Sequence, residues 1–467
     1  MKRVIVLSIL CVMAASSAFA QNHEGEWFAC KDNVVVRVAF SEGGRFSIFN
    51  EAASNMSFEC SYTVSDGGRK IDLPDFADGM GGAGIMRFNA DGSMEMNIVL
   101  GIPGFVKRPE SIDSHPSSPE NLYLHLYRDR SAVEAMLPEP EKIPEEASLA
   151  FERNRRLGAG INLNAVVDGN LHPGYERDAP LKDGEIKSIA DAGFSSVRLN
   201  VCWSKHCSTD WPYVIDPVFF DKVDGIVDEC LRHGLAVSLD VHYYPYINMN
   251  DPDRNLTMDE NYDRLVCLWG QIAEHYKDYS DETLFFDLLN EPNLSMSPER
   301  WNGLLSELIK TVRKTNPGRT ILVATPSLGQ SWTLNLLDLP EGEWNVIVEF
   351  HYYLPHLFTH QSLSYAMAGH VKGMEWKGSD EERKPIESDL DYCRRWSEKN
   401  GRPLNMGEYG VTNTADEKSR ALYIGFMKNA AESRGFSSHL WGYREPFMIK
   451  DEKTGRWIRP ILDAMDL

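Results

Sequence analysis

Beyond its first 20 residues, the sequence has no apolar run near the ~20 residues that a membrane-spanning helix needs, so we expect no membrane span. The chain is also short of positive charge. Against 69 Asp and Glu stand 48 Lys and Arg, which gives a formal charge of −21. This excess argues against nucleic acid and anionic lipid as partners, because both are polyanions. A neutral polymer such as a polysaccharide is compatible with it.

Cysteine is scarce, with 8 residues in the chain, and its spacing resembles no zinc site. The cysteines after residue 20 are Cys30, Cys60, Cys202, Cys207, Cys230, Cys267 and Cys393. In an oxidising compartment we expect Cys30 to pair with Cys60, because both fall in one small β-rich region. Cys202 and Cys207 could close a short loop. The odd number leaves at least one thiol free.

Phosphate-binding motifs are missing as well. Gly158-x-Gly160 is not followed by the remaining glycine of a dinucleotide-binding loop, and no P-loop occurs in the sequence. A doubly wound sheet, the main competitor for a chain of alternating strands and helices, therefore lacks support.

What the chain does have begins with a leader pattern. Lys2 and Arg3 precede an apolar run over positions 4–13, and Ala18-Phe19-Ala20 supplies small residues for a cleavage site. We therefore expect residues 1–20 to be a signal peptide cleaved after Ala20. The mature protein is expected to be secreted or periplasmic.

Short alternating or β-branched runs dominate residues 21–128. Strands are expected at 34–40, 45–50, 61–64, 85–89, 94–100 and 122–127, with Gly and Asp turns between them. We predict a small antiparallel β domain, a sandwich or a barrel, whose Gly25-Glu26-Trp27 opening is loosely lipocalin-like. Trp27 fits the plug of such a core, and a sugar-binding role for the domain is the alternative. Residues 129–150, rich in Pro and Glu, predict a stiff exposed connector.

From residue 151 to residue 467, strands and helices alternate. Strand candidates are 157–163, 195–201, 235–241, 283–290, 320–325, 346–351, 403–408 and 437–441, and helical patterns include 217–233 and 261–279. This alternation predicts an α/β domain with the (β/α)8 TIM barrel fold.

Two of these strands deliver a glutamate to their C-terminal ends. The strand at 283–290 leads to Glu291 and is stopped by Pro292, which cannot donate to a ladder. The strand at 403–408 ends in Glu408. All strands of a parallel barrel end at one rim, and the fourth and seventh strands lie across the barrel from each other. Glu291 and Glu408 are therefore expected to face each other over a central pit.

The other rim candidates, predicted to bind substrate, are Arg198, His242, Asn290, His351, Tyr353 and Trp441. Glycoside hydrolysis needs one protonated carboxyl group to release the leaving oxygen and one carboxylate to meet the oxocarbenium-like carbon. Arg198 and Tyr353 are expected to keep Glu408 ionised. Glu291, without an obvious cationic neighbour, is expected to be the acid.

Aromatic residues gather at or just beyond the strand ends, where rings could stack on the apolar C–H faces of sugars. They are Trp203, Trp211, Tyr243, Tyr244, Trp332 and Trp441. The segment between His351 and Pro403 adds Tyr352, Tyr353, Phe358, Tyr365 and Trp376, and it is predicted to form a wall of the substrate site. For any single ring, a place in the core is the competing interpretation.

As an ordered set, Arg198, His242, Asn290-Glu291-Pro292, His351-x-Tyr353, Glu408 and Trp441 resemble glycoside hydrolase family five, the cellulase family of clan A retaining glycosidases. The runs at 158–163 and 358–361 are also similar, and the resemblance covers about residues 150–467. It implies a retaining double displacement with Glu291 as acid/base and Glu408 as nucleophile, without a metal or organic cofactor.

The resemblance also assigns binding roles. It implies that Asn290 hydrogen-bonds the sugar 2-hydroxyl, that His242 and His351 line the same subsite, and that Trp441 is its floor. One departure lies at the rim, where Asn164-Ala165 replaces the family's usual Gly-Asn.

The implied function is that of a secreted endo-β-1,4-glycanase, an endoglucanase first, acting on a polysaccharide. Mannan, xyloglucan, β-1,3-glucan and exo-acting hydrolysis are alternatives among enzymes. A glycan-binding protein on the same barrel is the alternative outside enzymes, and the presence of both carboxylates argues against it. Asp240-x-His242 suggests a metal-ligand pair, but no other strand end adds His or Asp in a ligand arrangement, so no metal is expected.

Overall fold

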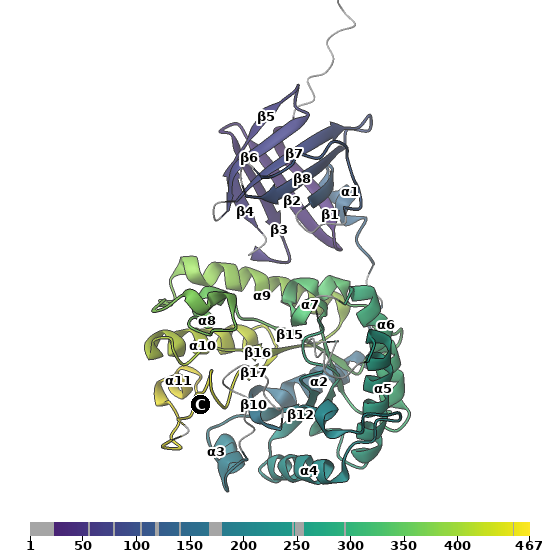
Figure 1. The fold of residues 1–467 in the computed structure, drawn as a ribbon, viewed down its shortest axis with the longest axis vertical. Helices are drawn as coiled ribbons and strands as arrows, with labels where there is room; N and C mark the ends of the chain where they lie inside the picture. The colour runs from purple at the N-terminus through teal and green to yellow at the C-terminus, as the bar shows by residue number, and fades with distance from the viewer. Residues whose placement is uncertain are drawn as a thin grey trace, which may run out of the picture. The chain divides into compact units, whose positions relative to one another are not determined.

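The computed structural model describes residues 23–467 except 55–56, 78–79, 103–104, 117–120, 140–141, 168–179, 245–246, 248–255, 294–295 and 452. The expected signal peptide at 1–20 therefore lies outside the described residues. The chain divides into two compact units, Met1–Glu139 and Pro140–Leu467 (Figure 1). The predicted connector at 129–150 contains the short helix α1 (Arg130–Glu134) and the beginning of α2 (Ala147–Leu157).

The first unit is an antiparallel β domain. Its strands are β1 (Gly25–Lys31), β2 (Val34–Ser41), β3 (Arg45–Asn50), β4 (Phe58–Ser61), β5 (Thr63–Ser65), β6 (Lys70–Ala77), β7 (Met80–Phe88), β8 (Met94–Gly101) and β9 (Asn121–Leu126). Strands β1 to β4 form one sheet and β5 to β9 another, each in sequence order. The predicted all-β domain is confirmed.

The two sheets share one core and are joined at their outer strands. Trp27 and Phe46 from one sheet pack with Met96 and Leu124 from the other. Phe28 in β1 and Tyr127, just after β9, exchange two backbone hydrogen bonds of 2.8 and 2.7 Å. The domain is therefore an up-and-down meander whose first and last strands meet around a filled interior.

Two details of the predicted strands are wrong. Residues 61–64, expected as one strand, divide between β4 and β5, which belong to different sheets. The predicted set also lacks β1 and β6. Strand β6 contains Pro74, which has no N–H for a ladder and so weakens the strand pattern.

The expected Cys30–Cys60 disulfide is also wrong, because neither Cys30 nor Cys60 forms a disulfide. Cys60 lies in the shared core, whereas Cys30 packs with Phe28 and Val133 on the other face of β1. Side chains alternate between the two faces of a strand. That alternation places the two sulfur atoms on opposite sides of the sheet.

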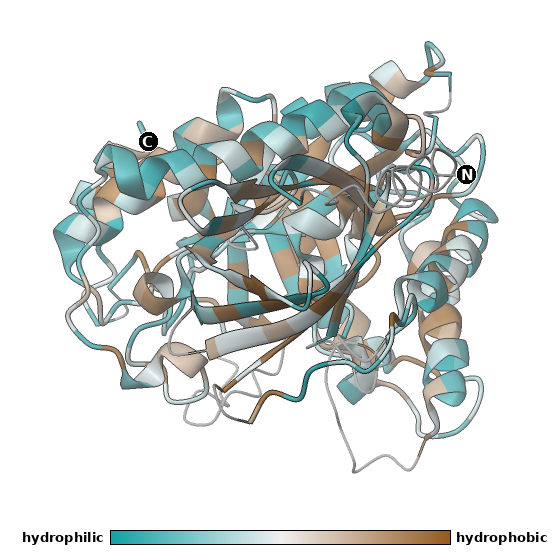
Figure 2. Ribbon diagram, turned by 90° about the horizontal axis from the view of Figure 1, so that it is seen from above, coloured by the Kyte–Doolittle hydropathy of each residue, from teal (hydrophilic) through white to brown (hydrophobic). Residues whose placement is uncertain are grey.

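The second unit is a closed barrel of parallel strands, and the predicted TIM barrel is confirmed. Its strands are β10 (Ala159–Val167), β11 (Ser196–Val201), β12 (Ala236–Val241), β13 (Leu284–Asp287), β14 (Ile321–Ala324), β15 (Val346–His351), β16 (Leu404–Tyr409) and β17 (Ser437–Leu440). Figure 2 shows teal and brown stretches mixed along the helices, as expected of helices that bury one face and expose the other.

After α2, the helices of this unit are α3 (Glu185–Asp191), α4 (Pro217–Arg232), α5 (Met258–His275), α6 (Pro298–Arg313), α7 (Pro326–Gly329), α8 (His356–Thr359), α9 (Asp380–Asn400), α10 (Glu417–Glu432) and α11 (Arg459–Ala464). Short 3₁₀ helices span Trp203–His206, Ser331–Leu336 and Met367–His370. Among the described residues, none of the helices combines the length and the apolar character that crossing a membrane requires.

Local signals set the helix ends. Helix α4 starts where the Asp216 side chain accepts a hydrogen bond from Val218 N, with Pro217 in the first turn. Helix α5 starts three residues before the predicted position, because Thr257 and Glu260 form a capping box. Both predicted helices are confirmed.

Strand β11 shows how the fold delivers polar groups to the barrel interior. Its residues are all buried, and Arg198 reaches across the interior to Asp287 on β13, with Nε 2.8 Å from Oδ2. Because side chains alternate along a strand, Ser196 and Asn200 share this inner face. The barrel centre beneath the rim is therefore polar and charged.

Candidate active site

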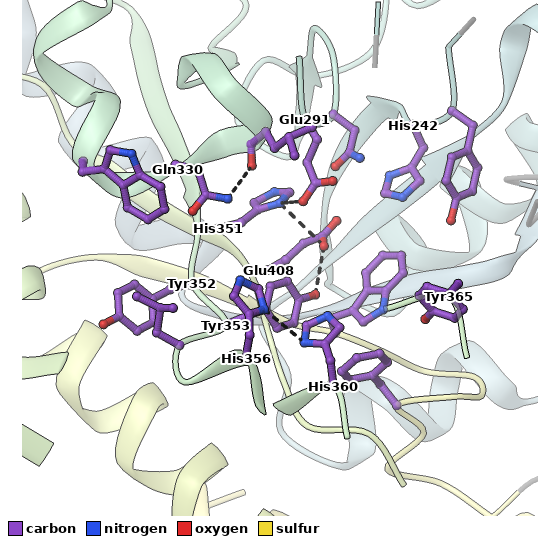
Figure 3. Close-up of a pocket in the computed structure, with 17 residues that line it drawn as sticks. His242, Glu291, Gln330, His351, Tyr352, Tyr353, His356, His360, Tyr365 and Glu408 are labelled. Atoms are coloured by element: carbon purple, nitrogen blue, oxygen red, sulfur yellow. Dashed lines mark hydrogen bonds and ion pairs between the residues drawn. The ribbon is translucent and has the colours of Figure 1, made fainter. Parts of the chain in front are cut away.

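The C-terminal ends of the barrel strands surround a cavity of about 380 Å³ (Figure 3). The predicted site residues that line it are His242, Asn290, Glu291, His351, Tyr353, Glu408 and Trp441. Arg198, the remaining one, lies beneath the cavity and has no exposed surface. All eight predicted residues are thus brought together.

Glu291 follows β13 on a short buried link. The backbone N–H of Asn290 donates to Val241 O at 2.9 Å, which fixes the link against β12. Glu291 itself has a φ of 32°, in the left-handed region, where a non-glycine residue stores about 1–3 kcal/mol of strain. Its side chain points toward His351 and Glu408 and keeps 33% of its surface exposed (Figure 3). The backbone therefore holds a partly open carboxyl group at the cavity wall.

Glu408 lies on β16 itself and is held from two sides. The Tyr353 hydroxyl donates to Oε2 at 2.9 Å, and Arg198 Nη1 donates to Oε1 at 3.1 Å. A register shift between β15 and β16 sets Glu408 opposite His351. The preceding residue must be small, because a Cβ on Gly407 would overlap the Glu349 carboxyl group. Glu408 is thus a buried carboxylate with fixed orientation.

The two glutamates approach closely. One carboxylate oxygen of Glu291, one of Glu408 and one ring nitrogen of His351 all lie within 4.8 Å of one another. A pair of carboxyl groups that acts by double displacement on one anomeric carbon stands about 5–5.5 Å apart, whereas an inverting pair leaves room for water at about 6.5–9.5 Å. The spacing therefore suits attack and protonation on the same bond.

Comparison with known proteins agrees with this geometry. The cellulase model, glycosyl hydrolase family 5, matches residues 164–444, a range that contains every predicted site residue. The chain belongs to glycosyl hydrolase family 5. The β domain before the barrel lies outside the match.

Several relatives are endoglucanases by name. Endoglucanase H of Acetivibrio thermocellus is 29% identical over 294 residues, which are 62% of this chain and 30% of that protein. The cellulase/esterase CelE of the same organism is 28% identical over 333 residues, 67% of this chain and 39% of that protein. This chain therefore matches only about a third of the length of these two relatives.

Solved structures match the barrel over nearly their whole length. Cel5A of Thermotoga maritima, solved with mannotriose and with cellobiose, is 36% identical and has a TM-score of 0.62, covering 68% of this chain and 99% of that one. The cellulose synthase subunit Z of Clostridioides difficile is 33% identical with a TM-score of 0.61, covering 66% and 99%.

Arg198 is the centre of the buried charges in this family 5 barrel. Its guanidinium lies 3.1 Å from Asp240, 2.8 Å from Asp287, 3.0 Å from Glu349 and 3.1 Å from Glu408. Burial raises the pKa of Glu349, but the charge of Arg198 together with the hydrogen bond and charge of His351 outweighs it and brings that pKa to about 2. Burial and the Glu349 charge raise the pKa of Asp287 well above its usual range. The cluster therefore favours the charged form of Glu349 and the protonated form of Asp287.

His351 connects the two glutamates. Its Nδ1 lies 2.8 Å from Glu291 Oε1 and 3.6 Å from Glu408 Oε2, while its Nε2 lies 3.2 Å from Glu349 Oε1. Burial lowers the pKa of His351, but Glu408 and the other two carboxylates outweigh it and raise the pKa well above the ordinary value. These carboxylates therefore favour the protonated, cationic form of the imidazole beside Glu291.

The expectation that Glu291 lacks a cationic neighbour is thus wrong. Burial raises the pKa of Glu291, but the hydrogen bond and charge of His351 bring it below its ordinary value. Burial raises the pKa of Glu408, and the Glu291 charge adds to this despite the opposing effects of His351 and Arg198. The sequence led us to expect a higher pKa for Glu291 than for Glu408, and the two shifts have the opposite directions. The difference arises from the pairing of His351 with Glu291, which depends on the geometry of the rim.

His242 and Trp441 form one wall. His242 Nδ1 lies 2.6 Å from Asp240 Oδ2, and the His242 ring stacks on Trp441 with centroids 5.3 Å apart and an angle of 10°. Asn290 Oδ1 accepts a hydrogen bond from Arg198 Nη2 at 3.1 Å, which fixes its amide. These contacts fix the orientations of the His242, Trp441 and Asn290 side chains.

The Glu291, His351 and Glu408 cluster is also spaced as a metal site would be. Its chemistry favours hydrogen bonding instead. A metal ligand must offer a lone pair, whereas the two ring nitrogens of His351 face Glu291 and Glu349 and its pKa is raised. The set therefore fits a shared proton better than a cation.

Sequence reasoning missed two buried residues that support the site. Asn162 Oδ1 accepts a hydrogen bond from Arg198 at 3.1 Å, while its amide donates to Gly407 O at 2.8 Å. Glu349 contacts both Arg198 and His351. Glu349 stands two positions before His351 on β15, so the alternation of side chains was the available signal.

The predicted aromatic residues divide into three groups. Tyr243, Trp332, Tyr352, Tyr353, Tyr365 and Trp441 line the cavity, as does Phe447, which was not predicted. Trp203, Tyr244, Phe358 and Trp376 are core residues. Trp211 is exposed and outside the cavity. Asn164, the departure from the family pattern, accepts a hydrogen bond from Arg444 N at 2.9 Å and so ties β10 to the loop after β17.

Proposed function

We propose that this protein is a secreted or periplasmic glycoside hydrolase that cuts β-1,4-linked polysaccharide within the chain and retains the anomeric configuration. The observation that carries the proposal is the pair of carboxyl groups of Glu291 and Glu408, which share one cavity at the spacing of a double-displacement pair. Membership of glycosyl hydrolase family 5 and the endoglucanase names of the relatives support it.

In the first step, the Glu408 carboxylate attacks the anomeric carbon while Glu291 gives a proton to the glycosidic oxygen. The bond to the leaving chain breaks, and an ester to Glu408 forms. In the second step, Glu291 takes a proton from water, the water oxygen attacks the anomeric carbon, and Glu408 leaves as a carboxylate. Two inversions at one carbon retain the configuration.

The contact between Glu291 and His351 supplies the proton. The raised pKa of His351 and the lowered pKa of Glu291 favour the proton on His351 in the free protein. Substrate that excludes water from the cavity disfavours this separated charge, so the proton transfers from His351 Nδ1 to Glu291 Oε1 along the hydrogen bond that joins these atoms, which lie 2.8 Å apart. His351, held from the far side by Glu349, then accepts from Glu291.

The test of the two roles uses variants of each glutamate. Glu408→Gln should abolish turnover with the fold intact. Glu291→Ala should retain hydrolysis of aryl glycosides with good leaving groups, lose about 10²- to 10⁴-fold on polysaccharide, and yield a β-glycosyl azide when azide is added. A Glu408→Gln variant with full activity, or an α-configured azide product, would overturn the assignment.

The backbone sugar is proposed from the relatives. Their names favour β-1,4-glucan, and the Thermotoga maritima neighbour was solved with both cellobiose and mannotriose. Release of reducing ends from purified cellulose derivative, mannan, xyloglucan and β-1,3-glucan decides among them. A rapid fall in viscosity relative to reducing ends indicates internal cuts.

A glycan-binding protein without turnover is the second candidate. It predicts retardation in a polysaccharide gel without any released sugar. Secretion rests on residues 1–20, and the amino-terminal sequence of the exported protein should begin at Gln21. Detection of residues 1–20 on the mature protein would contradict cleavage.

A further inference from the structure

Trp211 is exposed in a way that no other tryptophan of this chain is. It lies in the loop between β11 and α4, and 76% of its surface is open to solvent, whereas the others are buried or half-buried. Val214 and Val218 beside it in sequence are 52% and 72% exposed. A large apolar ring exposed to solvent is unusual and marks a candidate binding surface.

The loop that carries Trp211 is rigidly built. Ser208 N donates to Val214 O at 2.8 Å, and Val214 N donates to Ser208 Oγ at the same distance. Tyr213 N donates to Asp210 O at 2.8 Å, and Cys207 pairs with Ile215 as an antiparallel bridge. The loop is thus a closed frame with Trp211 at its tip.

Helix α5 anchors this frame through residues spaced along one face. Gln271 Oε1 accepts from Ile215 N at 2.9 Å, and Gln271 Nε2 donates to Tyr213 O at 3.1 Å. One turn earlier on the same face, the side chain of Cys267 lies beside the side chain of Trp211. The loop is therefore held against α5, while most of the Trp211 side chain stays open to solvent.

A sugar ring is the ligand that this surface suits. A ring carried on a loop that is already fixed costs little conformational entropy on binding, and the C–H face of a pyranose matches a flat aromatic ring. The exposed Thr209 and Asp210 beside it can bond hydroxyl groups. One indole and two valines offer far less than the roughly 800 Å² per partner of a stable protein interface.

The position of the loop connects this surface with the cavity. The loop leaves the C-terminal end of β11, the strand that carries Arg198, and so belongs to the rim on which the cavity lies. Trp211 is not among the residues lining the cavity. We propose that Trp211 is a stacking platform that binds a sugar ring of the polysaccharide outside the catalytic cavity and so retains long chains on the protein.

This inference rests on the proposed function for the identity of the glycan. The test measures binding without turnover: affinity gel electrophoresis of the Glu408→Gln protein in hydroxyethylcellulose and in mixed-linkage β-glucan, with and without Trp211→Ala. Loss of the ring should weaken retention roughly 3- to 10-fold. Trp211→Tyr, which keeps a ring, should restore most of it. Leu422→Ala, at another exposed apolar position, should leave retention unchanged.

Turnover separates the platform from the cavity. In the otherwise native protein, Trp211→Ala should leave kcat/KM for a short aryl glycoside unchanged and lower it for the long polysaccharide. Unchanged retention, equal loss on both substrates, or a Trp211-dependent dimer in sedimentation would each overturn the proposal. Retention that depends on Trp211 in a protein without any hydrolysis would sustain this inference and refute the proposed function.

Discussion

The Nδ1 atom of His351 lies 2.8 Å from Oε1 of Glu291, so the residue proposed as acid/base shares its proton with a neighbour that titrates. Neither group can be assigned a protonation state alone, because a change in one shifts the pKa of the other. In the proposed mechanism, the active form is the pair with one proton and an ionised Glu408. Activity should therefore depend on the proton count of the three groups together.

This relationship fixes the sign of the pH dependence. The pKa of Glu408 is raised from 4.5, so kcat/KM should fall as the pH drops through a value above 4.5, where Glu408 becomes protonated. The pKa of His351 is raised from 6.5, so the pair should keep its proton, and activity should persist, until a pH above 6.5. A pH profile on a soluble aryl glycoside measures both limbs. An acidic limb below 4.5 would contradict the first assignment.

Glu349→Gln should shift mainly the basic limb of the pH profile. The Glu349 carboxylate raises the pKa of His351 through the 3.2 Å contact with Nε2, so its removal should let the pair lose its proton at lower pH. The basic limb should shift to lower pH, while the acidic limb changes less. Glu343→Gln, which alters a half-buried ion pair with Arg313, is the control and should leave the profile unchanged.

Tyr353→Phe should shift the acidic limb of the pH profile. The hydroxyl donates to Glu408 Oε2 at 2.9 Å, and loss of a hydrogen bond to a carboxylate raises its pKa. The acidic limb should shift upward and kcat should fall roughly 10- to 100-fold, the worth of a hydrogen bond to a charged group. Tyr409→Phe is the control, because Tyr409 lies on β16 next to Glu408 but does not line the cavity. It should change neither the acidic limb nor kcat. An unshifted acidic limb in Tyr353→Phe would show that this bond does not tune Glu408.

The sequence predicted most of the barrel because its strands are long apolar runs separated by capped helices. Glu291 and Glu408 were found because both stand where such a run stops. The pKa order was not predictable, since it depends on a 2.8 Å contact between residues 60 positions apart. In the β domain, Pro74 obscured β6, and the opposite orientations of Cys30 and Cys60 depend on strand register. Glu349 escaped notice because it lies inside a strand that reads as buried and apolar.

Arg198→Met should destabilise the barrel. The guanidinium contacts Asp240, Glu349 and Glu408, and its loss leaves buried carboxylates without their cation, a change that costs about 3–5 kcal/mol. The midpoint of urea unfolding, followed by tryptophan fluorescence, should fall accordingly. Arg300→Met, at a surface ion pair with Asp259, should change the free energy of unfolding by less than about 1 kcal/mol. Equal midpoints for the two variants would show that Arg198 contributes no more to stability than a surface ion pair does.

Gly407→Ala tests whether the barrel wall tolerates any side chain beneath Glu408. An added Cβ would overlap the carboxyl group of Glu349, and this carboxyl group cannot retreat, because Arg198 and His351 hold it from two directions. We expect a loss of at least about 1–3 kcal/mol of stability, typical of overpacking, together with a large fall in kcat as Glu408 shifts. Gly225→Ala in helix α4, where nothing lies within 4 Å, should be neutral or stabilising by up to about 1 kcal/mol. A Gly407→Ala variant that matched Gly225→Ala in both unfolding midpoint and kcat would mean that Glu349 moves freely, and the fixed orientation of His351 would then need another source.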